Sequence, residues 1–542
     1  MLIIEFTIFN TNLQTQKGEH IMLQRLRDTL ADPDGFVRDL WHRTPAHIRT
    51  TFFSAAAVGL ATHLYAFTNK FANHDDLYQL FRGGYGVFSG RWLLPTVLRM
   101  DGSFSIPWLI GLLGIAFLSL GACLVVSLLR VRRPLGCLLA GALLVSFPSV
   151  TATLGYLFTS DAYFFGLLLA ELGAWAALRR GWWGSALGAA LICLSLGVYQ
   201  SYLPVAAALM VGALLLETLD GGEVRALLWK VLRCAGTLAL GLTLYLLVVR
   251  LTTLETGLTD YEGISEMGKL PLARLPEMIH AAYRAYISFF LEDVYHYQVR
   301  FLKYLLLLTG AGSAAGFVWL LWQRRPGPGR TILALALAAL YPLAGGLIYV
   351  MVPNGAVHTH MLYGLVFALL APISLTELIT ERPRLAGSAL RALALLSLAF
   401  AVYGYAVTAN SFYLRLDMSL RECTAWSNRL IARIESCPGY EPGMDVVLVG
   451  SEQREAALYP SPEMDVSQMM GMDDLADLRT APSYDLFLRH YLAFAAPVHT
   501  GHTELAQSYA GQKTVQQMPL YPREGSVKVL DGALVVKLNE AS

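Results

Sequence analysis

Long apolar runs recur along most of this chain, and they constrain its fold more than any other feature. A membrane-spanning helix needs roughly 20 predominantly apolar residues, and the sequence contains about eleven such runs. The sequence therefore predicts an all-α polytopic membrane protein. The runs lie near 50–69, 105–129, 134–157, 162–178, 184–199, 202–218, 231–250, 301–322, 331–352, 361–379 and 388–408.

The composition supports a membrane protein and argues against several other classes. Only 15% of the residues are charged, whereas soluble domains carry about 25%. The formal net charge of +1 gives no overall field that would attract nucleic acid. The six cysteines have neither the density of a disulfide scaffold nor the spacing of a zinc site.

Basic residues predict how the chain crosses the membrane, because Lys and Arg in short loops favour the cytoplasmic side. They precede the first apolar run and follow every second run after it, which places the N-terminus inside and the C-terminal tail outside. This pattern predicts a multi-pass membrane protein. The basic residues are Arg43, Arg49, Arg130, Arg132, Arg133, Arg179, Arg180, Arg225, Lys230, Arg233, Arg324, Arg325, Arg330, Arg382, Arg384 and Arg391.

Three segments follow from this reading: a cytoplasmic segment 1–49, a transmembrane domain 50–410 and a periplasmic α/β tail 411–542. Within the tail, the pattern predicts an amphipathic helix over 411–437 and a buried strand over 444–450. Residues 527–538 read as a hairpin whose Asp-Gly pair favours a type I′ turn.

Polar and titratable residues gather at the predicted outer ends of different spans. Such groups are costly near hydrocarbon unless they are paired or functional, so their convergence suggests a site. For the two adjacent carboxylates that follow the first span, a solvated helix end is the alternative. The residues are Asp75, Asp76, Asp161, Tyr163, Tyr199, Gln200, His358 and His360.

The first outer loop also carries positive charge on the side of the membrane where it is disfavoured. Arg82 and Arg91 lie in this loop, and Trp92 follows directly. A phosphate handled at the outer face would explain these arginines, because a guanidinium binds phosphate with charge-assisted hydrogen bonds. The alternative is that long loops translocate whatever their charge.

These residue types suit transfer of a sugar from a lipid phosphate to a hydroxyl. A carboxylate can act as a general base toward the hydroxyl, and arginines can stabilise a departing phosphate. A transporter or flippase of lipid-linked sugars remains the alternative, although it would place carboxylates nearer the bilayer midplane. The predicted spans hold few carboxylates near the midplane, and Glu171 is the main exception.

The sequence identifies no cofactor and no metal site, and it leaves a divalent cation as an open alternative. His358 and His360 are two residues apart in a loop, which is a weak pattern for a metal. Contact with phosphate or substrate, or an ordinary loop, are the other readings of this pair.

Three ordered segments together resemble a known family. NHDDLYQLF…SGRWLLP, FTSDAYFFGLLLAELGAW and LSLGVYQSYLPVA are similar to the bacterial glucosyltransferase family II of O-antigen (lipopolysaccharide) modification. That family belongs to the GT-C class of polytopic glycosyltransferases. The likeness covers roughly residues 50 to 400, and it implies a GT-C-like fold, an acidic motif in the first outer loop and a polyprenyl-phosphate sugar donor.

Carried onto this chain, the resemblance makes Asp75 and Asp76 the acidic motif, with one of them acting as the base or orienting the acceptor. It also points to a cavity lined by Arg91, Trp92, Asp161, Tyr199 and Gln200. The last outer loop departs from the family pattern, because His358 and His360 stand where an arginine is expected.

The resemblance implies transfer of a hexose, with glucose favoured, from undecaprenyl phosphate to a surface polysaccharide or lipid-linked glycan of the cell envelope, on the periplasmic side of a bacterial inner (plasma) membrane. The expected partners are therefore this lipid-linked donor, the glycan acceptor and membrane lipid, with no nucleic acid. Arg82 and Arg91, together with His358 or His360, are expected to neutralise the phosphate as it leaves.

Overall fold

The computed structural model describes eleven parts of the chain, and every structural statement below concerns these residues. They are 32–71, 74–80, 89–179, 181–254, 257, 272–292, 299–352, 357–379, 385–450, 478–480 and 482–539.

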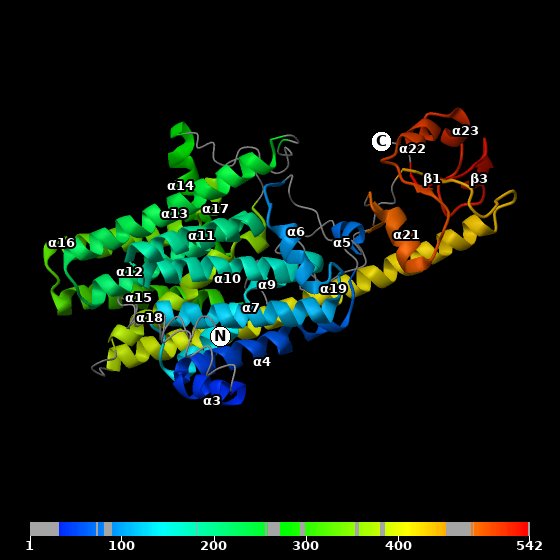
Figure 1. Ribbon diagram of the computed structural model, residues 1–542. Helices are drawn as coiled ribbons and strands as arrows, with labels where there is room; N and C mark the ends of the chain where they lie inside the picture. The colour runs from blue at the N-terminus through cyan, green and yellow to red at the C-terminus, as the bar shows by residue number, and fades with distance from the viewer. Residues whose placement is uncertain are drawn as a thin grey trace.

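Long helices lie alongside one another in a bundle, and a small domain lies beyond one end of it (Figure 1). Each of the eleven predicted apolar runs coincides with helical structure, which confirms the polytopic all-α fold. The helices are α4 (Ala46–Thr68), α7 (Pro107–Leu128), α8 (Pro134–Ser146) with α9 (Pro148–Leu154), α10 (Leu157–Arg179), α11 (Gly181–Val198), α12 (Leu203–Asp220), α13 (Val224–Thr252), α15 (Leu302–Arg324), α16 (Pro328–Gly345), α18 (Val366–Ile379) and α19 (Leu385–Glu435).

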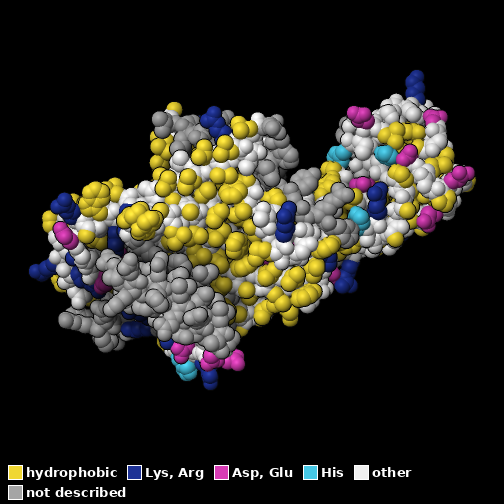
Figure 2. Space-filling model, viewed as in Figure 1, with side chains coloured by type: hydrophobic (Ala, Val, Ile, Leu, Met, Phe, Trp, Pro, Cys, Tyr) yellow, Lys and Arg dark blue, Asp and Glu magenta, His cyan; other side chains and the backbone are white. Residues whose placement is uncertain are grey.

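Within the described residues, nine helices are both long and apolar enough to cross a membrane. The two remaining predicted spans are weaker. The apolar helix Tyr363–Ile379 is shorter, and α4 carries polar residues such as Arg49 and His63. Hydrophobic side chains cover the visible middle of the bundle, whereas charged side chains gather at its end and on the small domain (Figure 2).

Short elements connect the spans at the end of the bundle that faces the small domain. A short helix, α3 (Pro33–Arg43), precedes the first span at the other end. A longer helix, α14, lies between α13 and α15 along the chain. The short elements are α5 (His74–Gln79), α6 (Leu94–Val97), η3 (Leu98–Asp101), η4 (Gln200–Tyr202), η6 (Leu272–Arg274), α14 (Leu275–Leu291), α17 (Ile348–Met351), η9 (Thr359–Met361) and η10 (Tyr363–Leu365).

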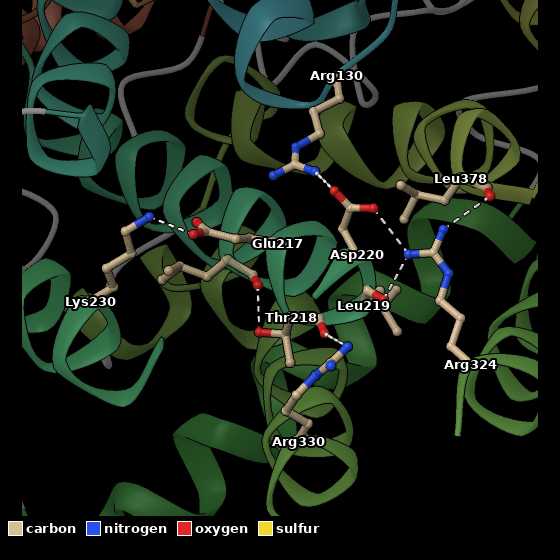
Figure 3. Close-up of polar contacts among 10 residues, drawn as sticks. Arg130, Glu217, Thr218, Leu219, Asp220, Lys230, Arg324, Arg330 and Leu378 are labelled. Carbon is tan, nitrogen blue, oxygen red and sulfur yellow. Dashed lines mark hydrogen bonds and ion pairs between the residues drawn. The ribbon is translucent and has the colours of Figure 1, made fainter. Parts of the chain in front are cut away.

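At the opposite end of the bundle, arginines close the C-terminus of α12 (Figure 3). Asp220 accepts hydrogen bonds from Arg130 at 2.7 Å and from Arg324 at 3.1 Å. Arg330 donates to the backbone carbonyl of Thr218 at 3.2 Å. The last carbonyls of a helix lack intrahelical partners and favour positive charge, so these contacts tie three other segments to α12.

One helix, α19, joins the bundle to the small domain. It runs for 51 residues from Leu385 to Glu435, about 75 Å at 1.5 Å per residue. The helix predicted over 411–437 is therefore the second half of α19. No Gly or Pro interrupts the chain between Gly404 and Pro438, so the helix continues past the apolar stretch.

The C-terminal domain is built on a four-stranded sheet with the order β2-β1-β4-β3. The central strand β1 (Val446–Val449) pairs in parallel with β2 (Val498–His499) and β4 (Ala533–Lys537). β3 (Val527–Leu530) pairs antiparallel with β4. Asp531 and Gly532 join β3 to β4 with φ angles of 48° and 84°, as the predicted type I′ turn requires.

Helices cover both faces of this sheet. Successive residues of β1 point to opposite faces, and because they are all apolar, both faces of the sheet are hydrophobic. Val446 and Leu448 pack in one hydrophobic cluster with the end of α19 and with α21 (Tyr484–Leu492). Val447 and Val449 pack on the other face against α22 (Glu504–Ala510) and α23 (Lys513–Gln516). The remaining short element is η14 (Leu478–Thr480).

Candidate active site

The acidic motif lies on α5, and the structure gives its two carboxylates different surroundings. Asp76 is buried, with 1% of its surface exposed. It forms an ion pair with Lys70 and accepts a hydrogen bond from the Ser105 hydroxyl. Lys70 also donates to Ser105 Oγ at 2.5 Å. A buried charge is tolerated when it is paired and hydrogen-bonded, so Asp76 fixes α5 to the segment before α7.

Lys70 is part of the same buried group. Burial lowers the pKa of its ammonium, and the neighbouring carboxylate of Asp76 opposes that shift. The sequence signal for this pair was weak, because Lys70 lies six residues before Asp76 across a break between two helices.

Asp75, by contrast, keeps half of its side-chain surface exposed. Its exposed fraction is 50%, and its Oδ1 lies 3.4 Å from Nε2 of His74. Of the two predicted catalytic carboxylates, Asp75 is therefore the one that an incoming hydroxyl can approach without breaking an existing buried ion pair.

The C-terminal domain contacts α5 directly (Figure 1). The hydroxyl of Ser483 donates to the backbone carbonyl of His74 at 2.9 Å. Leu77 belongs to the same hydrophobic cluster as Trp426 of α19 and Tyr484 of α21. The domain outside the bundle thus contributes to holding the acidic helix in place.

A second group of predicted residues forms around Arg91. The Arg91 guanidinium donates to the Tyr163 hydroxyl at 2.9 Å. It also lies over the ring of Tyr199, 5.1 Å from the centroid. The rings of Tyr163 and Tyr199 stack 4.4 Å apart at an interplanar angle of 8°. Cation–π and stacking contacts of this kind each contribute about 1 kcal/mol, and together they hold the guanidinium in one orientation.

The two histidines of the loop before α18 extend this stack. His360 stacks against Tyr199 with 5.9 Å between ring centroids, and His358 stacks against His360 at 5.7 Å. Burial, followed by the nearby His358 and Arg91, lowers the pKa of His360 to about 3. His360 is therefore neutral at physiological pH and offers a hydrogen bond rather than a positive charge.

Gln200 anchors the residues that precede Arg91. Its side-chain amide donates to the backbone carbonyl of Ser89 at 2.7 Å and to the Tyr245 hydroxyl at 3.0 Å. Gly90 has a φ of 75°, and a Cβ there would lie 2.7 Å from the same hydroxyl. Only glycine suits this conformation and this close approach.

Trp92 packs where α11 ends. A Cβ on Gly197 would lie 2.6 Å from the Trp92 ring, so the indole rests directly on the glycine backbone. The indole Nε1 is buried without a hydrogen-bond partner in the described part of the chain. Buried donors normally have a partner, so the hydrogen bond of this nitrogen is unfilled within the described structure.

Asp161 lies in the first turns of α10, two residues before Tyr163, and is 1% exposed. Its carboxylate accepts a hydrogen bond from the Ala162 amide at 2.8 Å. Nearby, Asp101 ends η3, and burial raises the pKa of its carboxyl group. A cavity of about 10 Å³ in this region is lined in part by Gln79 and Asp101, which is room for about one water molecule.

The structure thus brings Arg91, Tyr163, Tyr199 and His360 into one stack, with His358 at its edge. Gln200 bonds to Ser89, two residues before Arg91, and Trp92 packs on Gly197. The structure places Asp161 on the helix that carries Tyr163. Arg82 lies outside the described residues. Sequence reasoning did not single out Lys70, Ser105, Asp101 or Tyr245 as site residues. Across the described segments, no three His, Cys, Asp or Glu side chains come close enough to hold a metal ion.

Comparison with known proteins assigns the chain to a family. The family model described as Glucosyl transferase GtrII matches residues 64–369, more than half of the 542-residue chain. The chain belongs to this glucosyltransferase family. The matched region begins within α4 and ends within α18, so it contains every predicted site residue and confirms the resemblance read from the sequence. No curated protein and no solved structure matches the chain.

Membership in the GtrII family makes the protein a membrane glucosyltransferase. The match ends before α19 and the C-terminal domain. The contacts of that domain with α5 are therefore a feature of this chain that the family match does not describe.

Proposed function

We propose that this glucosyltransferase moves glucose from a polyprenyl-phosphate donor to a hydroxyl of a surface polysaccharide or lipid-linked glycan, at the periplasmic face of a bacterial inner membrane. The observation that carries the proposal is that Asp75, on α5, and Arg91, on the aromatic stack, lie at the same end of an apolar helical bundle. A base and a cation at a membrane surface are what glycosyl transfer from a lipid phosphate needs.

Arg91 is assigned to the donor phosphate. When the bond between the sugar and the phosphate breaks, the phosphate gains a negative charge, and a fixed guanidinium stabilises that charge as it develops. Tyr163 and Tyr199 hold the guanidinium before the reaction begins. His360, being neutral, would add one hydrogen bond to a phosphate oxygen. Trp92 Nε1 would donate to the phosphate or to a sugar hydroxyl.

Asp75 is assigned to the acceptor. Its carboxylate takes the proton of the acceptor hydroxyl, and the oxygen attacks the anomeric carbon of glucose. The bond from that carbon to the phosphate oxygen breaks, and the polyprenyl phosphate leaves with the electron pair. One displacement of this kind inverts the anomeric configuration. Asp76, already bonded to Lys70 and Ser105, keeps α5 in place.

The distribution of basic residues supports the periplasmic assignment. Arg130, Arg324 and Arg330 surround the C-terminus of α12, at the opposite end from α5 (Figures 1 and 3). Positive charge in short loops favours the cytoplasmic side. If this end is cytoplasmic, α5 and the C-terminal domain lie outside.

The donor can be tested with purified protein in lipid nanodiscs. Polyprenyl-phosphate glucose and UDP-glucose, each radiolabelled in the sugar, are offered with envelope polysaccharide from cells that lack this protein. We expect label in the polysaccharide only with the lipid donor. Transfer from UDP-glucose, with none from the lipid donor, would overturn the proposal.

A further inference from the structure

A groove of about 660 Å³ lies between α5 and the C-terminal domain. This volume falls within the range of about 300–1,000 Å³ that is typical of small-molecule sites. One wall comes from α5, and the other comes from α21 and the segment around β2. The lining residues are Leu77, Tyr78, Pro482, Asp485, Leu486, Arg489, His490, Val498, Thr500 and Thr503.

The side chains on the domain wall are mostly polar because of how α21 packs. Tyr484, Phe487 and Leu488 turn into the domain core. Asp485 and Arg489, four residues apart, therefore share a face of α21 that lies along the groove. The groove presents a carboxylate, a guanidinium and the hydroxyl of Thr500, which are groups that donate to or accept from sugar hydroxyls. The Thr503 hydroxyl instead caps α22.

The α5 wall supplies an aromatic ring beside the proposed base. Tyr78 is 45% exposed and lines the groove. It lies three residues after Asp75, so the two share a face of α5. The other face carries the buried Asp76 and Gln79. A sugar ring stacked on Tyr78 would therefore lie next to the half-exposed carboxylate of Asp75.

We propose that this groove binds the acceptor glycan and presents one of its hydroxyls to Asp75. The inference rests on the proposed function, which it extends by giving the acceptor a site on the C-terminal domain. The lining favours a glycan over the polyprenyl tail of the donor, because a hydrocarbon chain would leave Asp485 and Arg489 buried without partners.

The test uses full-length protein in nanodiscs, with polyprenyl-phosphate glucose as donor. The acceptor probe is envelope polysaccharide isolated from cells that lack this protein. Arg489→Ala and Asp485→Asn remove groove contacts. Arg523→Ala and Glu524→Gln are matched controls at exposed positions of the same domain. Thermal melting of each variant establishes that it is folded.

Each groove variant should raise the KM for the polysaccharide at least tenfold, the factor that corresponds to about 1.4 kcal/mol, because each weakens a hydrogen bond to a charged group. The rise should be several-fold larger than any change in the KM for the donor, and the controls should match the wild type. An acceptor KM within twofold of wild type in both groove variants would overturn the inference.

A labelling experiment tests the same site without turnover. Polysaccharide should slow the reaction of Pro482→Cys, an exposed position that lines the groove and leaves Asp485 and Arg489 in place, with a maleimide, and it should leave labelling of Arg523→Cys unchanged. Equal rates with and without polysaccharide would contradict the groove assignment. If the wild-type protein transfers no glucose from the lipid donor, the proposed function is wrong. If it transfers glucose but the groove variants keep the wild-type KM for polysaccharide, only the groove assignment is wrong.

Discussion

The hydroxyl of Ser483, in the C-terminal domain, donates to the backbone carbonyl of His74 at 2.9 Å. This contact joins residues 409 positions apart, and it lies at the start of the helix that carries Asp75 and Asp76. The C-terminal domain is therefore part of the scaffold of the acidic helix rather than an independent appendage.

Loss of the apolar contact between α5 and this domain should reduce activity. Leu77 is 2% exposed within the cluster that contains Trp426 and Tyr484, and truncation of a buried leucine to alanine costs about 2–5 kcal/mol. Leu77→Ala should release α5 and lower glucosyl transfer at least tenfold while the protein still inserts. Leu254→Ala, at a position that is 70% exposed, is the control. Equal transfer rates for Leu77→Ala and wild type would show that the domain does not position α5.

The bundle could be predicted from sequence because its signal is simple. Apolar runs of about 20 residues have one stable form in a bilayer, and all eleven coincide with helices. The hairpin at Asp531 and Gly532 followed from turn chemistry. The length of α19 did not follow, because the apolar count stops near residue 408 while the helix continues to Glu435.

The candidate site was predicted in part, for a related reason. The positions of Tyr163, Tyr199 and His360 at the outer ends of different spans predicted that they would meet, and they stack in one column. The pairing of Lys70 with Asp76, and the docking of α5 on the C-terminal domain, depend on tertiary contacts that no local pattern carries.

The ion pair of Lys70 and Asp76 should show strong energetic coupling. Removing one partner leaves the other buried and unpaired, which costs about 3–5 kcal/mol, whereas removing both is much less costly. Lys70→Met and Asp76→Asn should each lower the melting temperature clearly. The double variant should be more stable than the sum of the two single effects predicts. Simple additivity in this double-mutant cycle would mean that the pair does not hold α5.

Arg91 should be irreplaceable by lysine. Its planar guanidinium contacts Tyr163 and the face of Tyr199 together, a geometry that an ammonium does not reproduce. Arg91→Ala should lower kcat/KM by about 10²–10³, as loss of a donor to a developing charge does in other enzymes, and Arg91→Lys should recover little of it. Arg99→Ala, at an exposed arginine in η3, serves as the control. Near-normal kcat/KM in Arg91→Lys would show that the planar guanidinium is not required.

Stability should fall on acidification because of His360. Its pKa is about 3 in the folded protein and 6.5 in the absence of burial, so the unfolded chain binds more protons between these values. The contribution of His360 to stability is therefore complete above pH 6.5 and decreases as the pH falls toward 3. His360→Gln should melt with a shallower pH dependence between pH 7 and 5 than wild type or His42→Gln. An unchanged slope would contradict the burial of a neutral imidazole.

The orientation of the bundle can be tested by labelling. Gln507→Cys places a thiol on the surface of the C-terminal domain, and Gln323→Cys places one near the end of α15 beside the arginine cluster. In intact spheroplasts, a membrane-impermeant maleimide should modify the first and not the second. The reverse pattern would place α5 in the cytoplasm and exclude a periplasmic reaction.

The assignment of Asp75 as the base is tested most directly by transfer of glucose from polyprenyl-phosphate glucose to envelope polysaccharide, with Asp75→Asn compared with wild type in nanodiscs. The account predicts that Asp75→Asn melts like the wild type and transfers glucose at least 10²-fold more slowly, in keeping with the loss of a general base. A variant that is folded and transfers glucose at the wild-type rate would contradict it.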